Sequence, residues 1–166
     1  DRDRTILIAS QRDREVEEPT PEDLYDVGTV CTIMRMKKNP DGSIQMLVRA
    51  IGRVQVEAYQ QSTGLIEAEL APYDVEEGDD TVIEASFREL KEKFSDLLES
   101  GNRGLQAEVA QFILNLDDPG QFADYVAYHL DFRLEDKQAV LEARTVADRL
   151  RRVLVLIDTE IELQET

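Results

Sequence analysis

The chain has 166 residues, and its 36 acidic and 19 basic side chains give a net charge of −17 at neutral pH. This length suits one ordinary domain or two small ones. A nucleic-acid partner is disfavoured, because the excess acidic side chains would repel its phosphates and no Lys/Arg stripe offsets them. No apolar run approaches the roughly 20 residues of a membrane span, and the N-terminus lacks the pattern of a secretory signal. The lone Cys31 lies in an apolar strand pattern typical of a buried, unreactive thiol. Together, the single cysteine and the lack of a membrane span and of a secretory signal lead us to expect a cytoplasmic protein.

Residues 1–76 show the short, β-branched apolar runs of strands. The expected strands are Thr5–Ala9, 28–37, 43–51, 53–59 and 65–71. The turn Asn39-Pro40-Asp41-Gly42 closes a hairpin between the second and third of them. Gly52 predicts a bend or bulge, and Thr20 followed by Pro21 predicts a single helical turn. This half is therefore predicted to be a small, strongly curved antiparallel sheet or partial barrel.

From residue 79 the apolar period becomes helical. Thr81 and Glu84 form a capping box for the first helix, and Gly101 would cap its end. Asp118-Pro119 starts a third helix, and Thr145 with Asp148 starts a fifth. The inward stripes are predicted to be Ile83, Phe87, Leu90, Phe94 and Leu97; Leu105, Val109, Phe112 and Leu116; Phe122, Val126 and Leu130; and Val146, Leu150, Val153, Ile157 and Ile161. With a short fourth helix at 135–143, residues 77–166 are predicted to form a five-helix bundle.

The last helix shows no stop signal before Thr166, so we expect it to continue in a longer protein. Its final turns carry apolar residues on more than one face: Leu154, Leu156, Ile161 and Leu163. This end is predicted either to self-associate or to continue as a connecting arm.

The residue types that usually mark catalysis are uninformative here. Asp79-Asp80 and Asp117-Asp118 are explained by helix capping. His129, the only histidine, is expected to be a packed or helix-terminal imidazole rather than a base or metal ligand. One histidine and one cysteine give no support to a zinc site, so neither a metal nor a cofactor is predicted.

Met34, Met36 and Met46 cluster across the hairpin, and two interpretations remain open. Methionine fills irregular cores, and it is also overused on surfaces that bind many partners. Any of the three left exposed, together with Tyr25, would form a shallow surface for unfolded peptide segments.

Five fragments occur in the order in which the N-terminal domain of ATP-dependent Lon proteases carries similar ones. They are Asp23–Val30 (DLYDVGTV), Pro40–Ser43 followed by Met46–Val48, Ile51–Val54 (IGRV), Asp117–Leu130 (DDP…AD…AYHL) and Asp136–Glu142 (DKQAVLE). The resemblance runs from about Thr5 to the end of the chain. The chain departs from the family in two places. Members usually carry roughly forty further residues with a strand pair at the start, and the link at residues 100–104 is shorter and richer in glycine than the usual link between the first two bundle helices.

The resemblance implies an α+β fold, with a PUA-like partial β barrel in residues 1–76 and a helical bundle in residues 77–166. It also implies a non-catalytic domain that recognises unfolded or damaged proteins and supports assembly of a homo-oligomer, a hexamer in the parent protease. ATP and Mg²⁺ would belong to other modules, since the chain has no G-x-x-x-x-G-K-[ST] loop. The alternative functions are a free-standing Lon-like interaction adaptor and, against the charge, an RNA-binding barrel.

Overall fold

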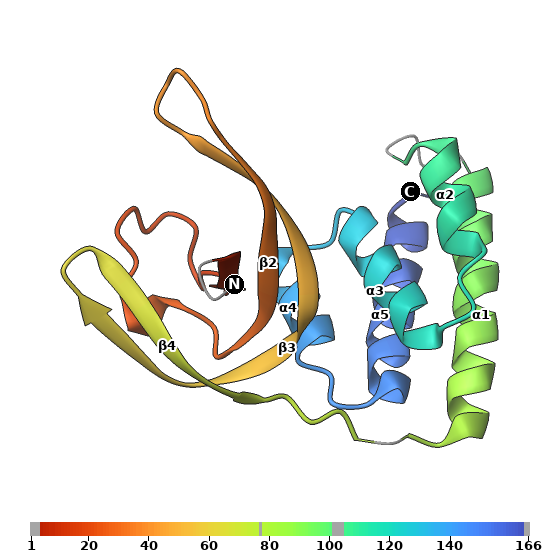
Figure 1. Cartoon of the computed structure of the whole chain (residues 1–166). Helices are drawn as coiled ribbons and strands as arrows, with labels where there is room; N and C mark the ends of the chain where they lie inside the picture. The colour runs from red at the N-terminus through yellow and green to blue at the C-terminus, as the bar shows by residue number, and fades with distance from the viewer. Residues whose placement is uncertain (1–3, 77, 101–104, 165–166) are drawn as a thin grey trace. The chain divides into compact units, whose positions relative to one another are not determined.

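The computed structural model describes residues 4–76, 78–100 and 105–164. Contacts between residues divide the chain into two compact units, Asp1–Tyr73 and Asp74–Thr166. The first unit holds the strands and the second holds the helices, as Figure 1 shows. The subdomain boundary at residue 76, expected from the sequence, stays a prediction.

The β unit is one four-stranded antiparallel sheet with the strand order β1-β2-β3-β4. Its strands are β1 (Thr5–Ile8), β2 (Val27–Lys38), β3 (Ile44–Ser62) and β4 (Leu65–Pro72), and the 3-10 helix η2 (Pro21–Asp23) precedes β2. The α+β class and the curved sheet are confirmed. The two runs expected at 43–51 and 53–59 are, however, a single strand of 19 residues.

A β-bulge explains why the sequence of β3 reads as two strands. Val30 pairs with Gly52 and Cys31 pairs with Ala50, so Ile51 is the extra residue between them. A bulge bends its strand and increases the local twist, which lets one continuous strand curve around the sheet. The bend expected at Gly52 is therefore confirmed, since Gly52 directly follows the extra residue Ile51.

The reversal between β2 and β3 has the predicted turn chemistry. Gly42 has a φ of 87°, a backbone region that residues with a Cβ rarely adopt. The Asn39 amide donates to the carbonyl oxygen of Ser43 at 2.8 Å, and the Ser43 amide donates to the Asp41 carboxylate at 2.9 Å. These bonds fix the register of the hairpin from its tip.

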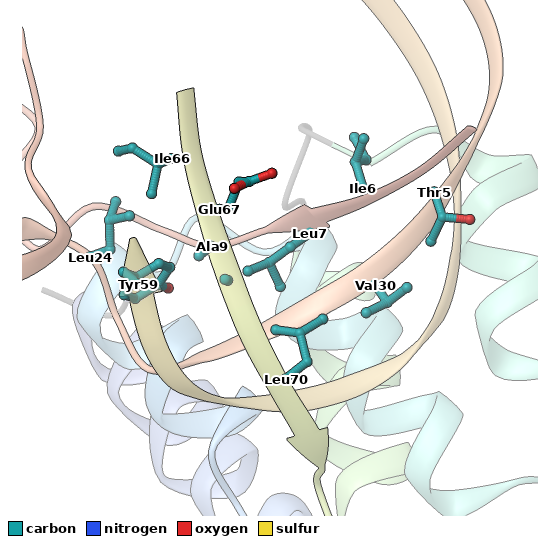
Figure 2. A pocket seen from close by; sticks show the side chains of 11 residues that line it. Thr5, Ile6, Leu7, Ala9, Leu24, Val30, Tyr59, Ile66, Glu67 and Leu70 are labelled. Carbon is teal, nitrogen blue, oxygen red and sulfur yellow. The ribbon is translucent and has the colours of Figure 1, made fainter. Parts of the chain in front are cut away.

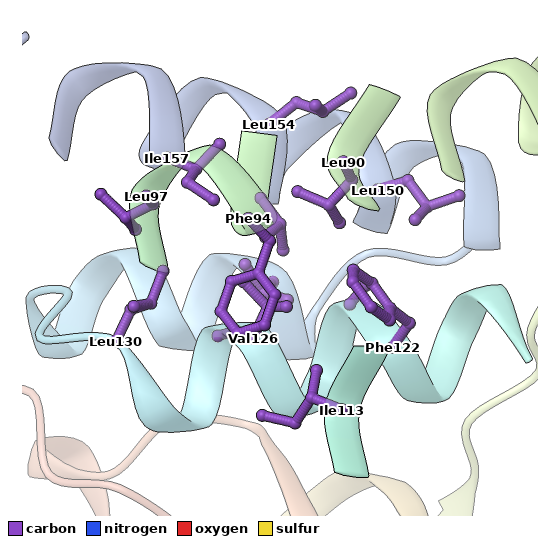
Figure 3. Close-up of a cluster of buried hydrophobic side chains, with 14 residues drawn as sticks. Leu90, Phe94, Leu97, Ile113, Phe122, Val126, Leu130, Leu150, Leu154 and Ile157 are labelled. Atoms are coloured by element: carbon purple, nitrogen blue, oxygen red, sulfur yellow. The ribbon is translucent and has the colours of Figure 1, made fainter. Parts of the chain in front are cut away.

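The helical unit contains the five expected helices around one apolar core. They are α1 (Asp80–Glu99), α2 (Ala107–Leu114), α3 (Pro119–His129), α4 (Leu134–Leu141) and α5 (Val146–Gln164). Figure 3 shows Phe94, Phe122 and Ile157 converging from three of these helices, and all three are fully buried. Phe122 meets the ring edges of Phe87 and Phe94 at centroid distances of 5.3 and 5.9 Å. The predicted stripes thus supply most of the core, but the inward position predicted for Phe112 is wrong: Phe112 is 51% exposed, and its neighbour Ile113 is the fully buried residue of α2.

The helix starts confirm most of the predicted caps and correct one. Thr145 Oγ1 accepts from the amide of Asp148, and Asp118 accepts from the amide of Gln121. The capping box placed at Thr81 is wrong, because the carboxylate of Asp79 accepts from the amides of Thr81 and Val82 and caps α1. The cap expected at Gly101 lies outside the described residues.

Candidate functional site

The β2–β3 hairpin continues beyond the rest of the sheet as a two-stranded ribbon. β1 pairs with β2 only from Thr29 to Thr32, and β4 pairs with β3 only from Val54 onward. Residues 33–51, here called the ribbon, therefore have no third strand in the described part of the chain. Figure 1 shows the orange tip of this hairpin extending away from the other strands of the β unit. Both faces of the ribbon can meet solvent, which is unusual for a strand pair rich in apolar residues.

All three methionines lie on the ribbon and are exposed. The exposed fractions of their side chains are 45% for Met34, 62% for Met36 and 48% for Met46. Met36 and Met46 lie directly opposite each other across the two strands. The interpretation that these side chains fill the core is therefore wrong, whereas their contact with unfolded segments stays a prediction.

Three further apolar residues are exposed on the ribbon and were not singled out from the sequence. Ile44, Leu47 and Ile51 are each about three-fifths exposed. A strand has one buried and one exposed face only where another layer of the protein covers it. The short pairing range of β1 and β4 removes that cover here. The apolar surface is consequently larger than the methionines alone.

Tyr25 lies apart from the methionines. It precedes the opposite end of β2 from the ribbon, and Met34 is nine residues further on, roughly 30 Å along an extended strand. Its ring is covered by the guanidinium of Arg12 at 4.6 Å, and its carbonyl oxygen accepts from the Tyr59 hydroxyl at 2.7 Å. Tyr25 is half-buried and serves to anchor the loop before β2, so the structure does not join it to the exposed surface.

A separate cavity of about 530 Å³ lies inside the β unit, lined by both edge strands, β1 and β4. Figure 2 shows Leu7, Val30 and Leu70 around it. Glu67 is the only charged side chain in its lining. Such a lining can accommodate apolar groups but offers no set of catalytic or metal-binding side chains.

The titratable residues of the described chain show no clustering of potential metal ligands. No group of three or more potential metal ligands occurs within those residues. Burial raises the pKa of the Cys31 thiol, which favours the unreactive protonated form, as expected for a buried cysteine. His129 ends α3 between Tyr125 and Tyr128, where burial and then the nearby Lys137 lower its pKa. It is thus a packed, helix-terminal imidazole, as predicted.

The four residues singled out at the end of α5 have different surroundings. Leu154 is buried in the bundle core, so it cannot contribute to a surface for self-association, contrary to the expectation. Leu156 and Ile161 are partly buried against the same core. Leu163 is 68% exposed, and Val155, which lies outside the predicted set, is 61% exposed. None of the helices in the described ranges is long and apolar enough to cross a membrane.

These features define a class: a curved antiparallel sheet that bears an exposed apolar ribbon, followed by a helical bundle. A family model described as the ATP-dependent protease La (LON) substrate-binding domain matches residues 1–159. The chain belongs to this family of substrate-binding domains, which is non-catalytic.

Curated relatives agree with this assignment. Lon protease 2 of Thermus thermophilus is 55% identical over 165 residues, which are 99% of this chain and 20% of that protein. The Lon protease of Desulforamulus reducens is 34% identical over 163 residues, 98% of this chain and 20% of that protein. The chain thus spans about a fifth of the length of the curated relatives it matches.

Solved structures share the fold. The N-terminal domain of Lon protease from the Mycobacterium avium complex superposes with a TM-score of 0.64 at 19% identity, covering 93% of this chain and 91% of that one. The Lon N-terminal domain protein of Xanthomonas campestris gives a TM-score of 0.52 at 13% identity, covering 91% and 88%. The order of a curved sheet followed by five helices is therefore the fold of Lon N-terminal domains.

Proposed function

We propose that the chain captures unfolded or damaged protein segments as the non-catalytic N-terminal domain of an ATP-dependent Lon protease. The observation that carries this proposal is the ribbon, where Met34, Met36 and Met46 are exposed on a strand pair that no other described strand covers. Family membership and the 55% identity to a Lon protease support it. Hydrolysis of ATP and of peptides would take place in other modules of the parent protease. The ATP and its Mg²⁺ ion would be bound there and not by this domain.

The chemistry of the ribbon suits varied substrates. Methionine is unbranched and polarizable, so it can adapt to partners of different shape without a preformed pocket. Burying one exposed methionine against an apolar partner contributes about 1–2 kcal/mol. Several such side chains would give a weak, tolerant attraction to apolar segments, which folded proteins hide and unfolded proteins expose.

Replacing the facing pair tests this proposal. In M36Q/M46Q both apolar side chains become polar at nearly the same length, without adding charge. We expect this variant to bind a permanently unfolded protein, such as reduced and carboxymethylated α-lactalbumin, roughly tenfold more weakly, since about 1.4 kcal/mol corresponds to a factor of ten. Fluorescence anisotropy of the labelled unfolded protein gives the Kd.

The matched control is Leu65→Gln, which removes an exposed apolar side chain at the start of β4, away from the ribbon. L65Q should bind as the unmodified chain does. Equal Kd values for M36Q/M46Q and the unmodified chain would refute capture by the ribbon. Circular dichroism spectra of the three proteins should agree, because all the substituted residues are exposed.

We also infer that the domain supports assembly of the homo-oligomeric parent, a hexamer in the cytoplasm. The exposed Val155 and Leu163 on α5 support this part of the proposal, because they leave apolar surface beside the bundle core. An oligomer would raise the local concentration of ribbons around each captured segment and so strengthen weak individual contacts.

A further inference from the structure

The hairpin is basic in an otherwise acidic chain. Residues 27–56 contain five basic residues and one acidic residue, a net charge of +4, whereas the whole chain carries −17. Arg35 and Lys37 on β2 are far in sequence from Arg49 on β3. Strand pairing nevertheless places the three side chains on one face of the ribbon, while the excess of acidic residues in the chain as a whole remains.

Strand register separates the side chains of the ribbon into two faces. β3 alternates regularly from residue 44 to residue 50, and residues directly opposite each other share a face. One face, here called the basic face, carries Arg35, Lys37 and Arg49 opposite Leu47, Gln45 and Thr32, respectively. The other, here called the apolar face, carries Met36, Ile44 and Met46.

The cations of the basic face are exposed, and no described carboxylate pairs with them. Within the described ranges, no carboxylate forms an ion pair with Arg35, Lys37 or Arg49, although ion pairs occur in both units. Arg35 and Lys37, together with Gln45, Met46 and Leu47, line a shallow hollow of about 370 Å³. Like charges held this close repel one another, so an anionic group placed beside them relieves that repulsion.

The outer edge of β2 offers backbone hydrogen bonds next to both faces. β1 stops pairing at Thr32, so residues 33–38 have no neighbouring strand on that side in the described chain. An extended segment can add to such an edge as a further strand, with main-chain hydrogen bonds for affinity and alternate side chains for specificity. Its side chains would point in turn to the basic face and to the apolar face.

We propose that the ribbon preferentially binds extended polypeptide segments in which acidic and apolar residues alternate. The segment adds to the edge of β2, so that its carboxylates lie beside Arg35 and Lys37 and its apolar side chains lie beside Met36. This selectivity rests on the proposed function of the ribbon as a capture surface. It goes further in naming a class of substrate that the acidic remainder of the chain would otherwise repel.

Peptides of roughly eight residues, the length of an ordinary strand, test the proposal. One alternates Val and Glu, a second alternates Val and Gln, and a third alternates Val and Lys. We expect the Val-Glu peptide to bind the unmodified chain roughly five- to tenfold more tightly than Val-Gln, the size of two or three exposed ion pairs, and Val-Lys to bind most weakly. The preference should disappear near 1 M salt, where the screening length is about 3 Å.

The variants R35Q and K38Q are matched controls for charge. Both remove one cation, but Lys38 lies opposite Ile44 on the apolar face. R35Q should reduce the preference for Val-Glu over Val-Gln severalfold, and K38Q should leave it nearly unchanged. Equal effects of the two substitutions would mean that only net charge matters, and would overturn the proposal.

Two further peptides test the strand geometry and the class of ligand. A Val-Glu peptide with proline at its centre loses a backbone donor and should bind more weakly. Unchanged binding of that peptide, or tighter binding of a single-stranded oligonucleotide of similar length, would overturn the inference. Loss of all charge preference while unfolded protein still binds through Met36 and Met46 would refute this inference alone. If the unfolded protein also failed to bind, the proposed function itself would be refuted.

Discussion

The guanidinium of Arg149 on α5 lies 3.3 Å from the carboxylate of Asp124 on α3, inside the helical unit. The Arg149 side chain is only 6% exposed, whereas that of Asp124 is 38% exposed. A cation that is buried to this extent depends on an anionic neighbour, because its desolvation is otherwise uncompensated. The pair therefore ties two core helices together through charge as well as through apolar packing.

Asp124→Asn should lower the free energy of unfolding by about 1–3 kcal/mol, since it removes this charge while keeping the size of the side chain. Urea denaturation followed by circular dichroism measures the change. Glu84→Gln is the matched control, because Glu84 pairs with Arg88 on the exposed surface of α1. That substitution should change stability by less than about 0.5 kcal/mol. Equal changes in the two variants would show that Asp124 has no special role.

Gly28 on β2 should tolerate no side chain. A Cβ built there would lie 2.6 Å from the carbonyl oxygen of Ile8 and 2.9 Å from a methyl carbon of Leu7, so β1 would have to shift. We expect Gly28→Ala to destabilise the β unit by about 1–3 kcal/mol. Gly52→Ala serves as the control, because nothing lies within 4 Å of its added methyl group. Chemical denaturation should show little change in G52A, and a stable G28A would contradict the close packing of β1 on β2.

His129 should make stability dependent on pH in a defined direction. Its pKa in the folded chain is lowered by burial and then by Lys137, so the unfolded state binds the proton more readily. Its contribution is complete above the unfolded pKa of about 6.5 and is lost as the pH falls toward the lower folded pKa. Urea unfolding at several pH values between about 7.5 and 5 measures this loss.

His129→Gln should flatten that part of the profile. The substitution removes the titrating group, so the difference between the two proteins isolates the histidine from the many carboxylates. The variant should lose less stability than the unmodified chain as the pH falls through this range. Parallel profiles would contradict a lowered pKa in the folded state.

The exposed end of α5 should mediate weak self-association. Val155 and Leu163 are the residues involved, and V155Q/L163Q removes their apolar surface without touching the buried Leu154. Sedimentation velocity at rising concentration should show a growing oligomer fraction for the unmodified chain and a smaller one for the variant. A strict monomer at all concentrations would exclude self-association of this end and leave the arm interpretation.

Much of the fold followed from local rules. The helix caps at Asp118 and Thr145 each join a side chain to a backbone amide three residues further on. The local sequence is therefore sufficient to place them. The cap of α1 was misplaced because Asp79 and Thr81 are both good capping residues, and the actual backbone decides which of them lies at the first turn. The turn at Gly42 was predictable for the same local reason, since it needs a positive φ.

The candidate site was less predictable. The cluster of Met34, Met36 and Met46 was visible in the sequence, but the same pattern is compatible with a core and with a surface. Tyr25 was predicted to share their surface, although part of an extended strand separates it from them in space. Leu154 was chosen for its place on the helix, and only packing against the other helices showed that it is buried.

Local patterns in the sequence were enough to predict the class of each element, the turn between β2 and β3, most of the apolar stripes of the bundle and the resemblance to Lon N-terminal domains. These depend on periodicity and on contacts between close neighbours in the chain. The fold in three dimensions was needed to show that no other described strand covers the ribbon, and that Arg35, Lys37 and Arg49 lie on the opposite face from Met36 and Met46. The physical reason is that exposure depends on where β1 and β4 stop pairing with the hairpin, and register depends on the bulges at Met34 and Ile51.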